Sequence, residues 1–190
     1  IKAVKGERGK LMVDIPNFTL TQMIANFRGI LDGNGHRVTM NINSTQNNAS
    51  FIADMQSGAE IHNLVFDGTI ITTQKFAGTV AASTQENSRI SNITSHVNII
   101  SETVGDGTHG GLVGVVNGYT TIDNCLFDGS ITGSATNSCG GLVGWHNAAG
   151  KITNCLQIAD LQVDAANSNT IGRAPTKFVA LNTYYKNALG

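Results

Sequence analysis

Short stretches in which apolar and polar residues alternate recur along most of the chain. The clearest are EIHNLVFDGTI (60–70), RISNITSHVNI (89–99), TIDNCLFDGSI (121–131) and KITNCLQIADL (151–161). This alternation, together with the many β-branched residues, predicts strands rather than helices. No long segment has apolar residues at the helical spacing, and the sequence predicts at most one short helix, over Leu20–Phe27.

These stretches are copies of one another. Each begins on an aliphatic residue, and successive copies lie 29, 32, 30 and 29 residues apart. The leading residues are Ile61, Ile90, Ile122, Ile152 and Leu181. Two positions after the first four stand Asn63, Asn92, Asn124 and Asn154. Nine positions after them stand Ile70, Ile99, Ile131 and Leu161. A constant period of about 30 residues indicates stacked coils, each of which shares its apolar face with its neighbours.

A second repeated segment lies between these copies. GGLVG occurs at 110–114 and again at 140–144, and weaker partners occur elsewhere. Its central position is β-branched in every copy, at Ile52, Val80, Val113, Val143 and Ile171. We expect its glycines to lie where a Cβ would be crowded, and they are Gly111, Gly114, Gly141 and Gly144.

The sequence therefore predicts an all-β fold, a right-handed parallel β-helix of about five to six coils. Equivalent residues should lie directly above one another at the strand spacing of about 4.8 Å. The asparagine column suits a bend, because asparagine tolerates the left-handed conformation and its amide can bond to the amide in the next coil. A β-sandwich is the alternative, but it does not require identical columns at a long fixed period.

The doubled GGLVG, the I-x-N-C blocks and the stretch FRGILDGNGHRV (27–38) resemble the GLUG repeat family of bacterial secreted and cell-surface proteins. The resemblance covers residues 9 to about 187. It implies a β-helix at the cell surface, often within a longer chain, and it supplies no catalytic residues. We divide the chain into an N-terminal strand or capping segment (1–26), a GLUG-type β-helix (27–187) and a tail (188–190).

Composition narrows the classes of partner. The net charge is -1 and only 13% of residues are charged, which argues against a nucleic-acid binder. No run of about 18 apolar residues is present, so no membrane span is expected in this segment. No cofactor motif is found. The three cysteines are too few for a disulfide scaffold. Cys125 and Cys155 share a column and are expected to pack in the core, whereas Cys139 is left as a reduced thiol.

The most chemically suggestive column is Asp67, His96 and Asp128, each six residues after a leading isoleucine. An acid–base–acid ladder could serve general acid–base catalysis or hold a divalent metal. Alternatively, Asp67-Gly68 and Asp128-Gly129 are local turns and His96 is a simple ion-pair partner. These three residues are candidates only, and no catalytic or metal site is assigned.

Two other places carry possible binding chemistry. Trp145 and His146 follow the second GGLVG, and one of them should point outward, where it could stack on a sugar ring. Asp32, Asn34 and His36 lie in LDGNGH, which lacks the further ligands of a calcium loop and is expected to be a tight turn in which His36 is a hydrogen-bonding partner. His62 and His109 are expected at solvated surface positions.

These features favour a non-catalytic segment of an exported bacterial surface protein, extracellular or at the cell surface and part of a longer chain. It would act as a rigid stalk or as a surface that binds host or environmental glycans or surface proteins. The enzymatic alternative is a polysaccharide lyase or glycoside hydrolase that uses an outer-face acidic cluster. A third possibility is a structural spacer whose ligand contacts lie elsewhere.

Overall fold

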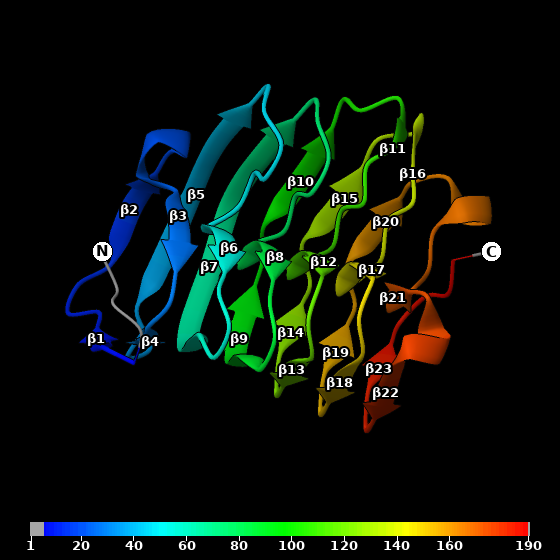
Figure 1. Ribbon diagram of the computed structural model, residues 1–190. Helices are drawn as coiled ribbons and strands as arrows, with labels where there is room; N and C mark the ends of the chain where they lie inside the picture. The colour runs from blue at the N-terminus through cyan, green and yellow to red at the C-terminus, as the bar shows by residue number, and fades with distance from the viewer. Residues whose placement is uncertain (1–5, 190) are drawn as a thin grey trace.

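The computed structural model describes residues 6–189. It is an all-β solenoid of about six turns with a period of about 29 residues. All pairs between its strands are parallel, as the coils follow one another along one axis. Figure 1 shows the coils side by side, with β1 near one end of the stack and β22 and β23 at the other. The predicted fold class is confirmed.

The largest sheet runs the whole length of the stack. Its main path is β20-β15-β10-β7-β9-β13-β18-β22, and β1, β2, β4, β5, β14, β19 and β23 pair beside it. Its strands are β1 (Arg8–Lys10), β2 (Ile15–Phe18), β4 (Ile30–Asp32), β5 (Arg37–Ser44), β7 (Glu60–Thr72), β9 (Ser88–Ser95), β10 (Asn98–Ser101), β13 (Thr120–Asp123), β14 (Leu126–Phe127), β15 (Ser130–Thr132), β18 (Gly150–Thr153), β19 (Leu156–Gln157), β20 (Asp160–Gln162), β22 (Phe178–Leu181) and β23 (Tyr184–Tyr185).

A second sheet forms another side of each coil. It has the order β21-β17-β12-β8-β6-β3. Its strands are β3 (Ile24–Phe27), β6 (Ile52–Met55), β8 (Ala81–Thr84), β12 (Val113–Val116), β17 (Val143–His146) and β21 (Gly172–Arg173). The strands β11 (Gly105–Asp106) and β16 (Thr136–Asn137) pair separately. The 3-10 turns are η1 (Leu20–Gln22), η2 (Ala165–Asn167) and η3 (Pro175–Lys177).

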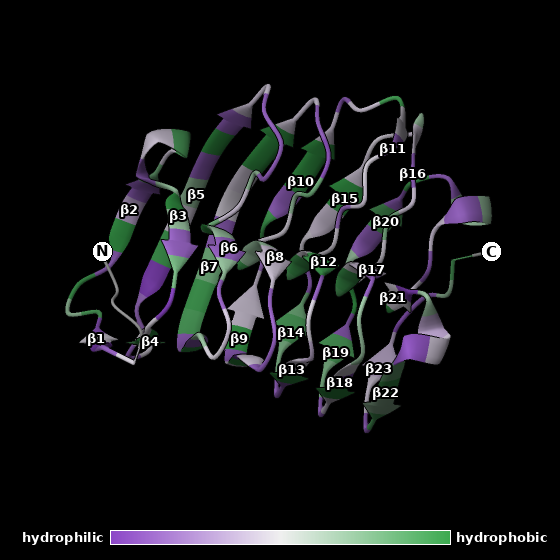
Figure 2. Ribbon diagram, viewed as in Figure 1, coloured by the Kyte–Doolittle hydropathy of each residue, from purple (hydrophilic) through white to green (hydrophobic). Residues whose placement is uncertain are grey.

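The interior is built from vertical columns of apolar side chains. Ile61 pairs with Ile90, Ile90 with Ile122 and Ile122 with Ile152, as the repeat predicts, and all four are buried. The prediction that Leu181 is the fifth member of this column is wrong. Ala180 pairs with Ile152, whereas Leu181 pairs with Thr153 and is 51% exposed. The last coil is therefore one residue shorter than the spacing suggested. In Figure 2, hydrophobic and hydrophilic colours alternate along β5, as expected for strands with one face inward.

The glycine-rich segment stacks with one register difference. Val113 pairs with Val143 and with Ala81, and Ala81 pairs with Ile52. Val80 and Ile171 therefore do not belong to the Val113 column. Their backbones instead bond to the neighbouring leucines, Val80 N to Leu112 O and Leu142 N to Ile171 O. The β-branched match misplaced these two copies, because Ala81 and Gly172 occupy the central position.

The predicted role of the glycines is confirmed. A Cβ on Gly111 would lie 2.1 Å from Phe127 Cδ1, and one on Gly144 would lie 2.5 Å from Gly114 O. A Cβ on Gly114 would lie 2.7 Å from Ala82 O, and one on Gly141 would lie 2.0 Å from Thr170 O. These positions are occupied by glycine because adjacent coils leave no room for a side chain.

The N-terminal segment joins the stack directly. β1 pairs with β4, β2 with β5 and β3 with β6. The helix expected over Leu20–Phe27 is reduced to the single 3-10 turn η1, because Ile24–Phe27 extends as β3 against the next coil. Residues 1–5 of the expected capping segment and residue 190 of the tail lie outside the described residues. No helix within residues 6–189 is long and apolar enough to cross a membrane.

Candidate functional site

The asparagine column forms a hydrogen-bonded ladder at a bend of the coil. Asn63, Asn92, Asn124 and Asn154 all have left-handed backbones, with φ of 60, 53, 52 and 55°. Asn92 Nδ2 donates to Asn63 Oδ1 at 2.9 Å, and Asn124 Nδ2 donates to Asn92 Oδ1 at 2.7 Å. Asparagine is suited to this place because its short amide tolerates the left-handed conformation at little cost. The expected stacking of these residues is confirmed.

The ladder extends beyond the four predicted residues and has one irregularity. It begins at Asp32, whose Oδ1 accepts from Asn63 Nδ2 at 3.0 Å. It ends at Asn182, which has φ of 48° and donates to Asn154 Oδ1. Asn154 itself donates to Asp123 Oδ1 at 2.9 Å rather than to Asn124. The side-chain oxygen of Asn124, Oδ1, therefore accepts no bond from Asn154 and can accept one from another donor.

The turn at Asp32 starts the ladder. Asn34 N donates to Asp32 Oδ1 at 2.8 Å, and His36 N bonds to Gly33 O, which closes a tight turn. The bonds from Asn63 and then from Asn34 hold the pKa of Asp32 below its ordinary value. His36 Nδ1 pairs with Asp14 Oδ1 at 2.8 Å. The expectation of a tight turn with a hydrogen-bonded His36 is confirmed.

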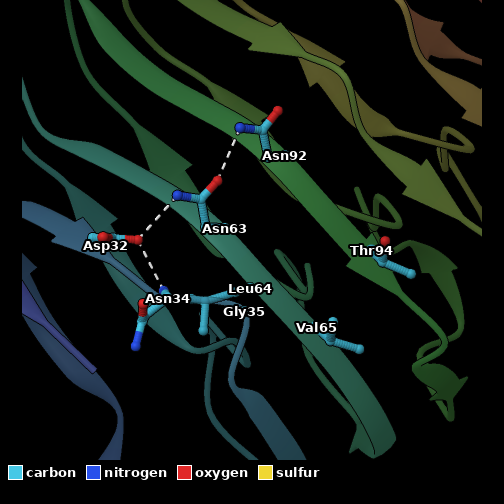
Figure 3. Close-up of a pocket in the computed structure, with 8 residues that line it drawn as sticks. All are labelled: Asp32, Asn34, Gly35, Asn63, Leu64, Val65, Asn92 and Thr94. Carbon is cyan, nitrogen blue, oxygen red and sulfur yellow. Dashed lines mark hydrogen bonds between the residues drawn. The ribbon is translucent and has the colours of Figure 1, made fainter. Parts of the chain in front are cut away.

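A shallow groove follows this ladder. Its first hollow, shown in Figure 3, has a volume of about 410 Å³ and is lined by Asp32, Asn34, Gly35, Asn63, Leu64, Val65, Asn92 and Thr94. A second hollow of about 330 Å³ is lined by Asn92, Ile93, Thr94, Asn124, Cys125, Leu126, Asn154 and Leu156. The two hollows share Asn92 and Thr94, so the groove runs along the axis of the stack.

The two sides of the groove differ in chemistry. One side is the amide ladder, in which each Nδ2 has a second hydrogen that the ladder does not use. The other is an outward column that continues from coil to coil. Its members are Val65, Thr94, Leu126 and Leu156. A ligand lying in the groove would meet hydrogen-bond donors on one side and largely apolar side chains on the other.

Asp67, His96 and Asp128 share one outward column, as the period predicted. The backbone N of His96 bonds to Phe66 O, and the N of Asp128 bonds to Ser95 O. His96 Nδ1 pairs with Asp128 Oδ1, whereas Asp67 Oδ2 pairs with Arg37 Nη1. Within the column only His96 and Asp128 pair with each other, whereas Asp67 pairs with Arg37 from the neighbouring strand β5. Among the described residues no three His, Cys, Asp or Glu side chains cluster closely enough to hold a metal ion.

The side chains of Trp145 and His146 lie on opposite faces of the strand β17. Trp145 is partly exposed and pairs with Val115 and Arg173, whose Cζ is 6.0 Å from the centre of the indole ring. The interpretation of His146 as a ligand-binding residue is wrong. Its side chain is inside, 1% exposed, and stacks on Phe178 with 4.3 Å between ring centres. Burial lowers the pKa of His146 to about 4, and neither ring nitrogen has a hydrogen-bond partner in the described structure.

His109 is also misplaced by sequence reasoning, since it is fully buried rather than solvated. The Ala77 N–H donates to its Nδ1 at 3.2 Å, so that Nε2 carries the hydrogen and donates to Ser101 Oγ at 2.9 Å. Burial lowers the pKa of His109 to about 4. His62 is partly exposed, with Nδ1 3.6 Å from Asp32 Oδ1.

The three cysteines are free and buried. Burial and the neighbouring Cys155 thiol raise the pKa of Cys125, and burial raises the pKa of Cys139 to about 11. The Cys125 and Cys139 thiols therefore remain protonated and are poor nucleophiles near neutral pH. The expectation that Cys125 and Cys155 pack in the core is confirmed.

Sequence reasoning missed the groove although its outer wall has a simple signal. Val65, Thr94, Leu126 and Leu156 each lie four residues after a leading isoleucine, which puts them in register on the outer face. Which columns face inward can be read from the period. Whether an outward column borders a hollow depends on the angle of the bend, which the sequence does not state.

Comparison with known proteins finds no matching family model, no similar curated protein and no similar solved structure.

Proposed function

We propose that this chain is a non-catalytic, rigid part of an exported bacterial surface protein, and that its ladder groove binds an extended polar chain such as a host or environmental glycan. The observation that carries the proposal is the continuity of the groove along the stacking axis, from Asp32 to Asn154. The surface location is supported by the GGLVG and LDGNGH stretches, which resemble GLUG repeats.

The chemistry of the groove suits a sugar chain. Sugars present hydroxyl groups at their edges and C–H groups on their faces. The amides of Asn63, Asn92 and Asn124 can donate to hydroxyl oxygens at regular intervals of about one strand spacing. The side chains of Val65 and Leu126 can contact the C–H faces. A rigid scaffold holds these groups in place before binding, which reduces the ordering cost of association.

The test fills the groove without touching the ladder. Thr94→Tyr places a bulky side chain between the two hollows, and Thr132→Tyr, on β15 of the same sheet outside the groove, is the matched control. We expect the wild-type chain and Thr132→Tyr to bind the same extended glycans on an array, and Thr94→Tyr to lose them. Equal binding by both variants, or no glycan binding by the wild-type chain, would overturn the glycan proposal and leave the rigid-spacer function.

A carbohydrate-active enzyme is the second candidate, and the pairing of His96 with Asp128 is the observation that favours it. A carboxylate that holds one nitrogen of a histidine leaves the other free to act as a base. Against it, Arg37 engages Asp67, which a glycosidase would need as a second free carboxyl group. Polysaccharide turnover that disappears in Asp128→Ala would support the enzyme, and absence of turnover in the wild-type chain would exclude it.

A further inference from the structure

Two basic side chains, Arg173 and Lys177, are held by backbone oxygens of the coil that contains Trp145. Arg173 follows Trp145 in the same outward column, on β21, and Figure 1 shows β21 beside β17 near the C-terminal end. Arg173 Nη1 donates to Ser138 O at 2.8 Å, which fixes the guanidinium and leaves other N–H groups unused. Lys177 Nζ donates to the backbone oxygen of Asn147 at 2.7 Å, two residues after Trp145.

Neither cation has an acidic partner among the described residues. Every carboxylate ion pair there involves Arg37, Lys75 or a histidine instead. Asp106 interacts electrostatically with Arg173, but its carboxylate is bonded to Lys75 and Thr108.

Other groups at the same place can recognise a sugar. The indole of Trp145 is partly exposed, and the Arg173 guanidinium lies over the ring with its Cζ 6.0 Å from the ring centre, at the outer limit of a cation–π contact. The amides of Asn117 and Asn147 form a second short ladder beside it, with 3.2 Å from Asn147 Nδ2 to Asn117 Oδ1. An aromatic face, amides and a planar cation together fit a sugar that carries a carboxylate.

We propose that Trp145 and Arg173, with Lys177 beside them, form a binding site for an acidic sugar of the uronic-acid class. This site lies on the six-stranded sheet and is separate from the ladder groove. Arg173 determines specificity, because its guanidinium pairs with the carboxylate through two parallel hydrogen bonds. Trp145 supplies the surface on which the sugar ring packs.

The experiment titrates the chain with oligogalacturonate, with its methyl ester and with inorganic polyphosphate at physiological ionic strength. The ester keeps the sugar ring and removes the charge, whereas polyphosphate keeps the charge and removes the ring. We expect the acid to bind at least roughly tenfold more tightly than either of the other two, the difference made by one charge-assisted bidentate contact.

Three variants locate the binding. Arg173→Gln and Trp145→Leu should each weaken oligogalacturonate binding by roughly tenfold or more. Arg28→Gln, which removes the same charge from an exposed position at the other end of the stack, should not change it. Circular dichroism checks that each variant is folded. Equal binding of acid and ester, equal binding of polyphosphate, or unchanged affinity in Arg173→Gln would each overturn the proposal. Thr94→Tyr should not affect this binding, so the experiment tests the acidic-sugar site independently of the proposal for the ladder groove.

Discussion

Asparagine is the side chain that defines the bend of each coil. It provides the left-handed backbone and, through its amide, a bond to the next coil. Replacing it removes both, whereas glycine would restore only the backbone freedom. The two contributions can therefore be measured separately at Asn92, which lies in the middle of the ladder.

We predict that Asn92→Ala lowers the free energy of unfolding by about 2 kcal/mol, from the strained backbone and two lost amide bonds. Asn92→Gly should lose about 1 kcal/mol, since it keeps the conformation. Asn43→Ala, at an exposed position in β5, is the control and should change little. Urea unfolding measures all three. Equal stability of Asn92→Ala and Asn43→Ala would mean that the ladder contributes nothing.

The two buried histidines make stability depend on pH. His109 and His146 have pKa values of about 4 in the folded chain, against an ordinary value of 6.5. Between these two pH values the unfolded chain binds more protons than the folded chain. The free energy of unfolding is therefore highest above pH 6.5 and decreases as the pH falls towards 4. Each histidine lowers the free energy of unfolding by about 3 kcal/mol over that pH interval.

His146 offers a direct test, because neither of its ring nitrogens has a hydrogen-bond partner within residues 6–189. We predict that His146→Met, which introduces the residue present at Met55 in the same column, stabilises the chain at pH 7 by about 1 kcal/mol. It should also remove about half of the loss between pH 6.5 and pH 4. His62→Gln, at a partly exposed site, is the control. An unchanged pH profile in His146→Met would show that the buried imidazole is not titrating as described.

The strands of the glycine-rich segment pack as closely as their glycines predict. We predict that Gly111→Ala destabilises the chain by about 3 kcal/mol, because the added Cβ would overlap Phe127 and the backbone of the next coil. Gly9→Ala is the control, since the nearest atom to its Cβ would be Leu31 Cδ1 at 3.8 Å. Thermal melting compares them. A melting temperature for Gly111→Ala equal to that of Gly9→Ala would contradict the crowding.

Strand positions were predictable where the repeat is strict and were misplaced where it is not. The isoleucine and asparagine columns were correct because both faces of the strand are constrained in every coil. Val80 was placed one residue off, since a valine next to the true position, Ala81, gave the better local match. His109 was predicted at a solvated surface position, and His146 was grouped with Trp145 as a ligand-binding residue, because the polarity of each side chain was weighed without its neighbours. Hydrogen bonds in one case and ring stacking in the other permit their burial.

The stack as a whole has unequal ends. At the N-terminal end Phe18 is buried and Ile15 and Leu20 pack against the core, although Met12 is 71% and Val13 is 67% exposed. At the C-terminal end Tyr184 is 65% exposed and Val179 is 56% exposed. In a solenoid each coil is stabilised mainly by its neighbours, so the last coil has about half the support of a central one.

We predict that amide hydrogens in β22 and β23 exchange with solvent much faster than those in β7, which is paired on both sides. β2, at the covered N-terminal end, should fall between them. Hydrogen exchange followed by mass spectrometry of peptides resolves these segments. Equal protection across the three would indicate a single cooperative unit without fraying at the uncovered end.

The amide ladder also has a polarity. Asn63, Asn92, Asn124, Asn154 and Asn182 all donate towards the preceding coil. Their side-chain dipoles consequently point the same way along the groove. A linear ligand with two chemically different ends would therefore bind with different affinity in its two orientations along the groove. If the groove binds a glycan as proposed, the glycan should therefore bind in one orientation, with its reducing end always towards the same end of the stack.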